Sequence, residues 1–320
     1  MKGLLGRLGL GLGAYAALAW VPLATSEYHT HILVIGFYYV VLAVGWNLLA
    51  GYTGQFSLAH HTFAGIGAYA STLLIQRTGI PILGGVVAGT VVAAAAGYGL
   101  GSLCLRMRAI YLALATWAFA ESVRLLVAAE YQITRGDLGL TAPRLFGTPR
   151  ATPYYYLFLG LAIAALLVAW QIVHSRIGAY LRAIRDDEEA AASLGVRTGP
   201  LKFGLFVLAG FGCGAAGALI LANTLFIQPQ SIFGVQWTAY MIFMVLVGGL
   251  GTFEGPILGA LVFFALQNWF AQFGAWYLIG LGVVAGAFAL FLPRGLWSLP
   301  ADRFHLRILP VGYDLKRLES

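Results

Sequence analysis

Residues 31–50 read HILVIGFYYVVLAVGWNLLA, a stretch of 20 residues without a single Asp, Glu, Lys or Arg. A helix of this length rises about 30 Å, which is the thickness of a membrane's hydrocarbon core. The stretch therefore predicts a transmembrane helix. The whole chain agrees, because 60% of its 320 residues are hydrophobic and only 10% are charged, against about 25% charged residues in soluble domains. An ordinary soluble enzyme, a disordered chain and a disulfide-rich secreted protein are excluded.

Ten apolar runs predict an all-α integral membrane protein, a polytopic bundle of about ten transmembrane helices (8–10) in a single domain over 1–320. The eighth and ninth runs are short and interrupted by glycine, which is compatible with broken or re-entrant helices, and the uncharged stretch 224–236 can also enter the membrane part-way. The first run could be a signal peptide, but its length favours a retained helix. The runs are 8–25, 31–50, 57–76, 80–104, 110–129, 154–173, 203–223, 237–250, 256–273 and 275–292.

The Lys and Arg residues predict the orientation. With the N-terminus inside, 14 of the 19 basic residues fall on the inner side, four fall on the outer side, and Arg124 lies within a span. Because basic loops tend to stay in the cytoplasm, both termini are expected there, with a charged inner loop at 174–202 and a tail at 293–320. Membrane orientation thus explains the net charge of +7 without nucleic acid. Cys104 and Cys213 have no metal-ligand spacing and are expected to pack in the interior.

Two glycine-interrupted segments join neighbouring spans. Residues 45–70 read GWNLLAGYTGQFSLAHHTFAGIGAYA, and residues 247–260 read VGGLGTFEGPILGA. Irregular backbone at membrane depth occurs only where it is buried in protein or lines a watery cavity. The first segment therefore predicts either a broken helix beside a translocation path or a short inner loop followed by a closely packed helix. The candidate path residues are Gly51, Tyr52, Gly54, Gln55, Ser57, Gly65, Gly67, Gly248, Gly249, Gly251, Gly255 and Pro256.

These two segments also share a spacing. The Gly-x-x-Gly-x-Phe pattern that begins at Gly51 recurs at Gly248. Paired glycine-interrupted segments in two halves of a chain indicate an internal repeat of the kind found in transporters. Both copies are expected on the inner side, which favours a parallel repeat, although one miscounted span would make it inverted.

The inner loop contains RAIRDDEEAAASLG at residues 182–195. Asp186 and Asp187 each offer a helix N-cap, and the two glutamates that follow suit the first turn of a helix. The three alanines favour a helix, and Gly195 suits its end. A helix of two turns is marginal alone, so we expect the membrane domain or a partner to brace it. On local chemistry alone, a solvated connector is the other interpretation.

Few other residues suggest chemistry. Glu121 and Arg124 share one helix face within a span, which predicts a structural ion pair or the lining of a polar path. His60 and His61 diverge by about 100° on a helix and cannot both face one metal, so we expect no metal site. The sequence has no GxxxxGK[ST] phosphate loop and no HExxH or GxSxG motif. We therefore expect no catalytic residue and no cofactor bound by this chain.

These segments, together with RGDLGLTAP at 135–143, occur in an order and at separations that resemble a known family. Over about residues 30–295 the chain resembles the permease subunits of branched-chain amino acid ABC importers, the LivM-type branch of the LivH/LivM family. The inner loop is similar to the EAA loop of ABC permeases, which favours a coupling helix over a bare connector. The ATPase-coupling residues implied by the resemblance are Arg185, Asp186, Asp187, Glu188, Glu189, Ala190, Ala191 and Gly195.

The resemblance also implies partners and a solute. The expected partners are a second permease of LivH type, two cytoplasmic subunits that bind ATP and Mg, and a periplasmic or extracellular solute-binding protein, all at the bacterial inner membrane. The implied solutes are leucine, isoleucine and valine, while related permeases handle urea, short amides or other small organic solutes. A more distant alternative is an ion-coupled secondary carrier, for which Glu121 is the carboxylate placed well inside a span.

Overall fold

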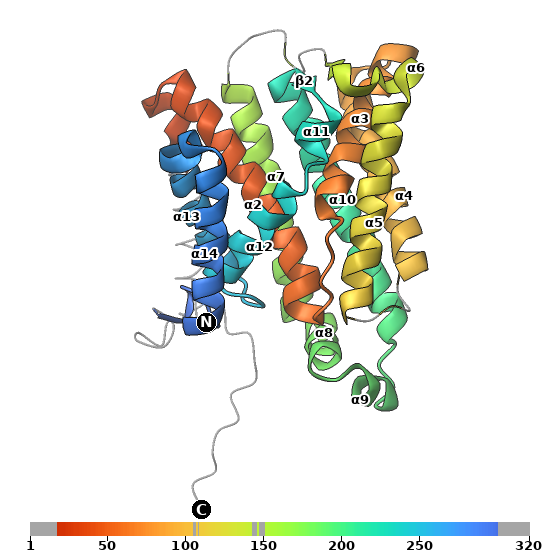
Figure 1. The fold of residues 1–320 in the computed structure, drawn as a ribbon, viewed down its shortest axis with the longest axis vertical. Coiled ribbons are helices and arrows are strands. Elements are labelled where there is room, and N and C mark those ends of the chain that lie inside the picture. Colours follow the sequence, from red (N-terminus) through yellow and green to blue (C-terminus); the bar gives the residue numbers. More distant parts are fainter. Residues whose placement is uncertain (1–17, 105–106, 108, 143–145, 147–150, 300–320) are drawn as a thin grey trace, which may run out of the picture.

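A computed structural model describes residues 18–104, 107, 109–142, 146 and 151–299 of the chain. The described part is mainly helical, and its long helices run roughly along one common axis (Figure 1). The prediction of an all-α polytopic bundle is therefore confirmed. The helices of more than ten residues are α2 (Glu27–Thr53), α3 (His60–Thr78), α4 (Ile82–Cys104), α5 (Ala109–Ala129), α7 (Thr152–His174), α8 (Arg176–Asp186), α10 (Thr198–Thr224), α12 (Gln236–Gly248), α13 (Gly255–Phe270) and α14 (Ala275–Phe291).

Short elements complete the described chain. A helical segment at 18–24 precedes α2. The other short elements are the helices α6 (Tyr131–Thr134), α9 (Glu188–Ser193) and α11 (Pro229–Ile232), the 3-10 helices η1 (Gly136–Leu138) and η2 (Ala271–Phe273), and the strands β1 (Leu140–Thr141) and β2 (Phe226–Ile227).

Every predicted run from 31–50 onward overlaps a helix over most of its length, whereas the run 8–25 falls mostly outside the described residues. Within the described part, seven stretches are long and apolar enough to cross a membrane. Two further predicted spans do not qualify, because α14 has 17 residues and α3 carries polar side chains near both of its ends. The seven stretches are Glu27–Thr53, Ile82–Cys104, Ile110–Ala129, Thr152–His174, Thr198–Ile220, Pro229–Gly248 and Gly255–Phe273.

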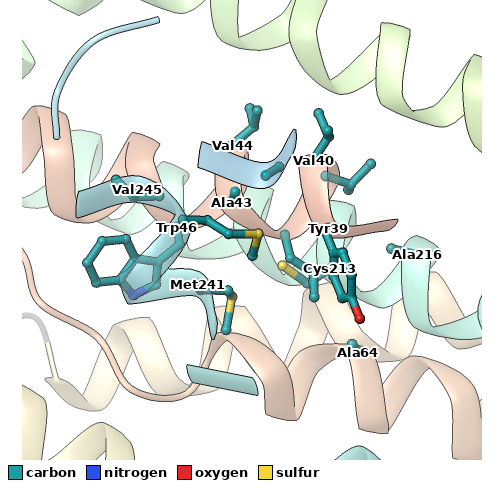
Figure 2. Packing of buried hydrophobic residues seen from close by; sticks show 14 of the residues in the cluster. Tyr39, Val40, Ala43, Val44, Trp46, Ala64, Cys213, Ala216, Met241 and Val245 are labelled. Atoms are coloured by element: carbon teal, nitrogen blue, oxygen red, sulfur yellow. The ribbon is translucent and has the colours of Figure 1, made fainter. Parts of the chain in front are cut away.

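The α2 helix lies at the centre of the bundle. It contacts α7, α10, α12 and α13, and most of its residues are buried. Figure 2 shows Tyr39 and Trp46 of α2 among side chains of α10 and α12, including Cys213 and Met241. Cys213 and Cys104 are both buried free thiols, so the expectation of interior cysteines is confirmed. A helix surrounded on all sides explains why the run 31–50 is apolar all round rather than on one face.

The helices α3, α4 and α10 pack closely through glycine. A Cβ on Gly97 of α4 would lie 2.7 Å from the carbonyl oxygen of Phe206, and a Cβ on Gly210 of α10 would lie 2.7 Å from that of Ala93. Any larger residue at either position would therefore push the two helices apart. Small residues at such contacts supply the van der Waals packing that holds membrane helices together.

The two ends of the bundle carry different connections. At the upper end in Figure 1, β1 pairs with β2 in antiparallel fashion, and Gln76 Nε2 donates to the Thr141 carbonyl. At the lower end lie α8 and α9, and beside them the chain passes from α12 to α13. The loops assigned to the inner side from their charge thus gather at one end, and those assigned to the outer side gather at the other.

Candidate functional site

The two glycine segments meet at the lower end of the bundle. Gly51 lies in the last turn of α2, and a Cβ there would stand 2.6 Å from the backbone nitrogen of Gly251. The Asn47 side chain joins the segments, because its Oδ1 accepts a hydrogen bond from Gly251 N at 2.9 Å and its Nδ2 donates to Thr252 O at 2.8 Å. The sequence indicated two similar motifs, but nothing in it showed that they touch.

Both motifs adopt the same local backbone form. The second glycine of each, Gly54 and Gly251, has a positive φ, of +69° and +73° respectively. Glycine reaches this left-handed region without the steric penalty that a Cβ brings. Each motif follows the end of one helix, α2 or α12, and turns the chain toward the next, α3 or α13. Their common position at one end of the bundle is the arrangement that a parallel repeat predicts.

Arg185, in the last turn of α8, ties the inner loop to this junction. Its Nη1 donates a hydrogen bond to the carbonyl oxygen of Gly51 at 2.7 Å. The same guanidinium nitrogen occupies the space that a Cβ on Gly251 would need. A hydrogen bond from a charged donor contributes about 1.5–3 kcal/mol. We call Arg185, Asn47, Gly51 and Gly251 the clasp, since they hold α2, α8 and the segment after α12 together.

The short helix α9 follows directly after α8. Asp187 is its N-cap, because Oδ1 accepts hydrogen bonds from Glu189 N at 2.9 Å and Ala190 N at 3.0 Å. Asp186 is the last residue of α8, and Gly195 lies just beyond the end of α9. The prediction of a capped short helix in the inner loop is confirmed, with Asp187 rather than Asp186 as the cap.

An ion pair braces α9 against the bundle. Lys202 Nζ of α10 lies 2.6 Å from Glu188 Oε1, and the Lys202 side chain is almost completely buried. A buried charge is stable only when a partner neutralises it. Ala191 of α9 is buried as well, whereas Glu189 and Ala190 are exposed. The membrane domain therefore supports one side of α9, as its short length led us to expect, and leaves the other side open.

Residues 54–59, which we call the extended segment, form neither helix nor strand and run back beside α2 before α3 begins. Side chains from α2, α5 and α12 form hydrogen bonds with backbone groups of Ser57 and Leu58 in this extended segment. Because an unpaired backbone group is expensive in an apolar interior, these hydrogen bonds fix the path of the chain. They run from Trp46 Nε1 to Ser57 O (2.9 Å), from Leu58 N to Thr116 Oγ1 (3.0 Å) and from Thr238 Oγ1 to Leu58 O (3.2 Å).

The extended segment starts at Gly54, beside Arg185 at the lower end of the bundle, and its later residues lie higher, inside the bundle. Trp46 precedes the end of α2 by seven residues, and Thr116 follows the start of α5 by seven. At 1.5 Å per residue, both lie about 10 Å from the lower ends of their helices. Figure 1 shows the orange chain between α2 and α3 rising within the bundle. The break between α2 and α3 therefore lies partly within the bundle, and a translocation path beside it stays a prediction.

Most of the other candidate path residues are closely packed. Gly65 faces the ring of Phe233, and Gly67 faces the backbone of Gly214. This environment agrees with the close-packing interpretation, so a solute path along these residues stays a prediction. Tyr52, Gln55, Ser57, Gly248, Gly255 and Pro256 are also buried, and a Cβ on Gly249 would lie 3.0 Å from the Arg294 carbonyl oxygen.

A cavity of about 690 Å³ opens beside Leu58. Its walls come mainly from α12 and α14, with apolar side chains such as Phe243 and Leu281. Gln236 and Thr238 add polar groups at its edge. This size and this mixture are typical of sites for small molecules. None of these residues is marked as a site residue by a sequence motif, and the uncharged stretch 224–236 is the single hint to the cavity.

Glu121 and Arg124 form an ion pair on α5. Arg124 Nε donates to both carboxylate oxygens of Glu121 at 3.0 Å, and Nη2 contacts Oε1. The Glu121 side chain is 39% exposed and that of Arg124 is 17% exposed. His60 and His61 are buried at the start of α3, and the described residues hold no cluster of three or more side chains suited to a metal.

The polar side chains that organise this region do not stand out in the sequence. Asn47, Thr116 and Thr238 each stand in an apolar run, where a single polar group attracts little attention. A polar group within a span is costly unless it finds a partner. That cost was the available signal, but it names no partner, and here the partners lie up to 205 residues away along the chain.

The apolar helices and the irregular segment at membrane depth together define a multi-pass membrane protein. The chain belongs to the family described as the permease component of branched-chain amino acid transport systems, whose model matches residues 28–294.

Three relatives illustrate this membership. The chain is 29% identical to the high-affinity branched-chain amino acid transport system permease protein LivM of Escherichia coli K12, over 91% of this chain and 74% of that protein. It is 23% identical to the LivH permease protein of the same strain, over 72% and 80%. It is 30% identical to the autoinducer 2 import system permease protein LsrC of Salmonella paratyphi B, over 48% and 49%. No solved structure matches the chain.

Proposed function

We propose that this chain is the transmembrane permease subunit of an ATP-binding cassette importer for leucine, isoleucine and valine. The observation that carries the proposal is α9, a capped helix that the Glu188–Lys202 pair fixes to the bundle while Glu189 and Ala190 stay exposed. In a chain of this permease family, such a helix is suited to dock into a cytoplasmic ATPase subunit. Asp186, Asp187, Ala191 and Gly195 would shape the same docking element.

ATP hydrolysis belongs to separate subunits in this proposal, because the sequence has no phosphate-binding loop. ATP and Mg would be bound there, and this chain would bind no cofactor. When the ATPase subunits close, α9 would move with them. Arg185 would pass the displacement to the end of α2 and to the segment around Gly251, since it contacts both. ATP would thus favour one of two conformations by binding them with different affinity.

The proposed assembly contains a second permease of LivH type, two ATPase subunits and an external solute-binding protein. Its site is the bacterial inner membrane, with the clasp end of the bundle in the cytoplasm. The excess of basic residues in the loops at this end supports that orientation.

Support for the solute comes from the names of two relatives and from the cavity beside Leu58, whose wall is mainly apolar. Burial of an aliphatic side chain against such a wall is favourable, by about 25 cal/mol of free energy for each Å² of apolar surface removed from water. The second candidate is urea, a short amide or another small organic solute, since the LsrC relative is named for autoinducer 2.

An ion-coupled carrier receives less support from the geometry. Such a carrier needs a carboxylate that can bind and release a cation during transport. Glu121, the carboxylate that the sequence offered for this role, is held by Arg124 through several hydrogen bonds. A coupling cation would have to compete with a guanidinium that is already in place.

The proposal is tested by purifying the tagged chain, expressed with its neighbouring genes, in a gentle detergent and identifying its partners by mass spectrometry. A second permease and two ATPase subunits are expected in the complex. Proteoliposomes that contain this complex should take up labelled leucine only with ATP inside the compartment of the ATPases. Recovery of the chain alone, with uptake that needs no ATP and collapses with an ion gradient, would contradict the proposal.

A further inference from the structure

The α5 helix buries only a narrow strip of its surface. Among its described side chains, the buried ones are Leu112, Thr116 and Ala120, which follow one another at intervals of four residues. Trp117, Glu121 and Arg124 occupy positions i, i+4 and i+7 and therefore share one flank beside that strip. Trp117 is 45% exposed and Glu121 is 39% exposed. A large part of this span is thus left uncovered by the chain itself.

We infer that this flank of α5, together with the extended segment beside it, is the surface on which a second permease chain of the same family packs. The inference rests on the proposed function, because a carrier that acts alone has no such partner. We call this surface the α5 face and define it by Phe56, Leu58, Trp117, Glu121 and Arg124.

The ion pair is the first argument that this surface does not face lipid. Glu121 is the 13th of the 21 residues of α5 and lies about 18 Å above the lower end of the helix. Charged side chains at such depth are rare, and they face the interior of an assembly or a watery cavity. Since a large part of the Glu121 carboxylate side chain is exposed in the single chain, something other than hydrocarbon must cover it.

The extended segment is an independent second argument. Ser57 and Leu58 have no regular structure and lie at membrane depth beside Trp46 and Thr116, and the neighbouring Phe56 is 41% exposed. Irregular backbone that faces lipid does not occur within the hydrocarbon region. The outer side of this segment must therefore be covered by protein or by the water of a path.

Hydrogen bonds show that the two features form one surface. Leu58 N donates to Thr116 Oγ1, so the extended segment lies directly against α5. Leu58 O in turn accepts a hydrogen bond from Thr238 Oγ1 at 3.2 Å, and Thr238 Oγ1 is 2.7 Å from His61 Nδ1. Leu58 and Thr238 both line the cavity of about 690 Å³, and the α5 face thereby continues into that cavity.

The chemistry of the surface favours a protein partner over water alone. Trp117 shares a flank of α5 with Arg124, and exposed Phe56 lies in the neighbouring segment. Aromatic residues and arginine are enriched at the centres of protein interfaces. By contrast, the exposed residues of α4, such as Val87 and Val91, are apolar and suit lipid. The partner is a related permease because the chain resembles two differently named permeases of one organism, LivM and LivH.

A photo-crosslinking experiment tests the inference. The photoreactive amino acid p-benzoylphenylalanine replaces Trp117 in one variant and Val91 in a matched control, because Val91 is 57% exposed and also lies in the middle part of its helix. Both variants are expressed with the neighbouring genes, illuminated in native membranes and analysed by mass spectrometry. Position 117 is expected to yield a protein adduct with the related permease, at least tenfold more than position 91.

The outcomes test the α5 face separately from the proposed importer function. Lipid adducts at 117, equal protein yields at 117 and 91, or an adduct with a second copy of this chain would each overturn the inference. An adduct between the two permeases would support it even where no ATPase subunit co-purifies, so failure of the importer proposal is read from the pull-down alone. A Trp117→Phe variant that assembles normally shows that changes in ring size at this site do not prevent folding.

Discussion

At the scale of single residues, the clasp depends on the absence of side chains. Gly51 and Gly251 allow the end of α2 and the segment after α12 to approach closely. The side chains of Asn47 and Arg185 fill the space beside these two glycines. A Cβ on Gly51 would collide with the Asn47 side chain, and a Cβ on Gly251 would collide with the Arg185 guanidinium. Either collision would break the hydrogen bond that the displaced side chain makes. The glycines are therefore required for the hydrogen bonds of the clasp as much as for packing.

We expect Gly51→Ala to destabilise the protein by about 1–3 kcal/mol, because the new methyl group overpacks the junction. The new Cβ would stand 2.6 Å from Gly251 N. Gly99→Ala is the matched control, since a Cβ at Gly99 of α4 meets nothing within 4 Å and removes an unfavourable helix glycine. Thermal unfolding in detergent should show a lower Tm for the first variant only, and equal Tm values would contradict the close approach.

Arg185→Ala should separate ATP hydrolysis from transport. The variant loses the hydrogen bond to Gly51 O, and we expect the solute transported per ATP hydrolysed to fall roughly tenfold, which corresponds to about 1.4 kcal/mol. Arg176→Ala is the control, because it removes an exposed cation of the same helix. Uptake and phosphate release are measured on the same proteoliposomes. An unchanged ratio in Arg185→Ala would show that the clasp does not transmit motion.

At the scale of elements, the sequence predicted the helices well and their contacts poorly. The run 31–50 became α2 because 20 uncharged residues leave a membrane helix as the stable choice. The run that began at residue 57 became α3 only from His60, because Trp46, Thr116 and Thr238 hold the preceding residues in an extended form. One partner comes from the preceding helix α2, and the other two come from α5 and α12, which lie 58 and 180 residues further along the chain. Local pattern therefore indicates that the chain breaks here but does not show where the broken segment goes.

The N-cap of α9 offers a test at the same scale. Asp187→Ala should weaken this short helix by about 1 kcal/mol, because two backbone N–H groups lose their acceptor. Asp187→Ser supplies another side-chain acceptor and should therefore keep most of the helix stability that Asp187→Ala loses. The measurement is the amount of ATPase subunit that stays bound to the tagged chain as salt is raised. Equal retention in all three proteins would argue against α9 as a docking helix.

At the scale of the whole molecule, the connections divide between two ends, and the charge bias predicts which end is cytoplasmic. Leu194 follows α9 at one end, and Leu138 lies in η1 at the other, and both are exposed. In intact cells, a maleimide that cannot cross the inner membrane should label Leu138→Cys and spare Leu194→Cys until the membrane is permeabilised. The native cysteines are buried and serve as the unlabelled background. The reverse pattern would invert the proposed topology.

The central position of α2 has a consequence for biosynthesis. Two of its polar side chains form hydrogen bonds with residues that the ribosome adds much later: Asn47 with Thr252 and Tyr39 with Gln267. At about 5–20 residues per second, some 200 residues of translation separate these groups by roughly 10–40 s. During that interval α2 sits in the bilayer with its amide and phenol groups unmatched. A ribosome that stalls after α10 would thus release a chain whose central helix lacks its last neighbours, the kind of substrate that membrane proteases remove.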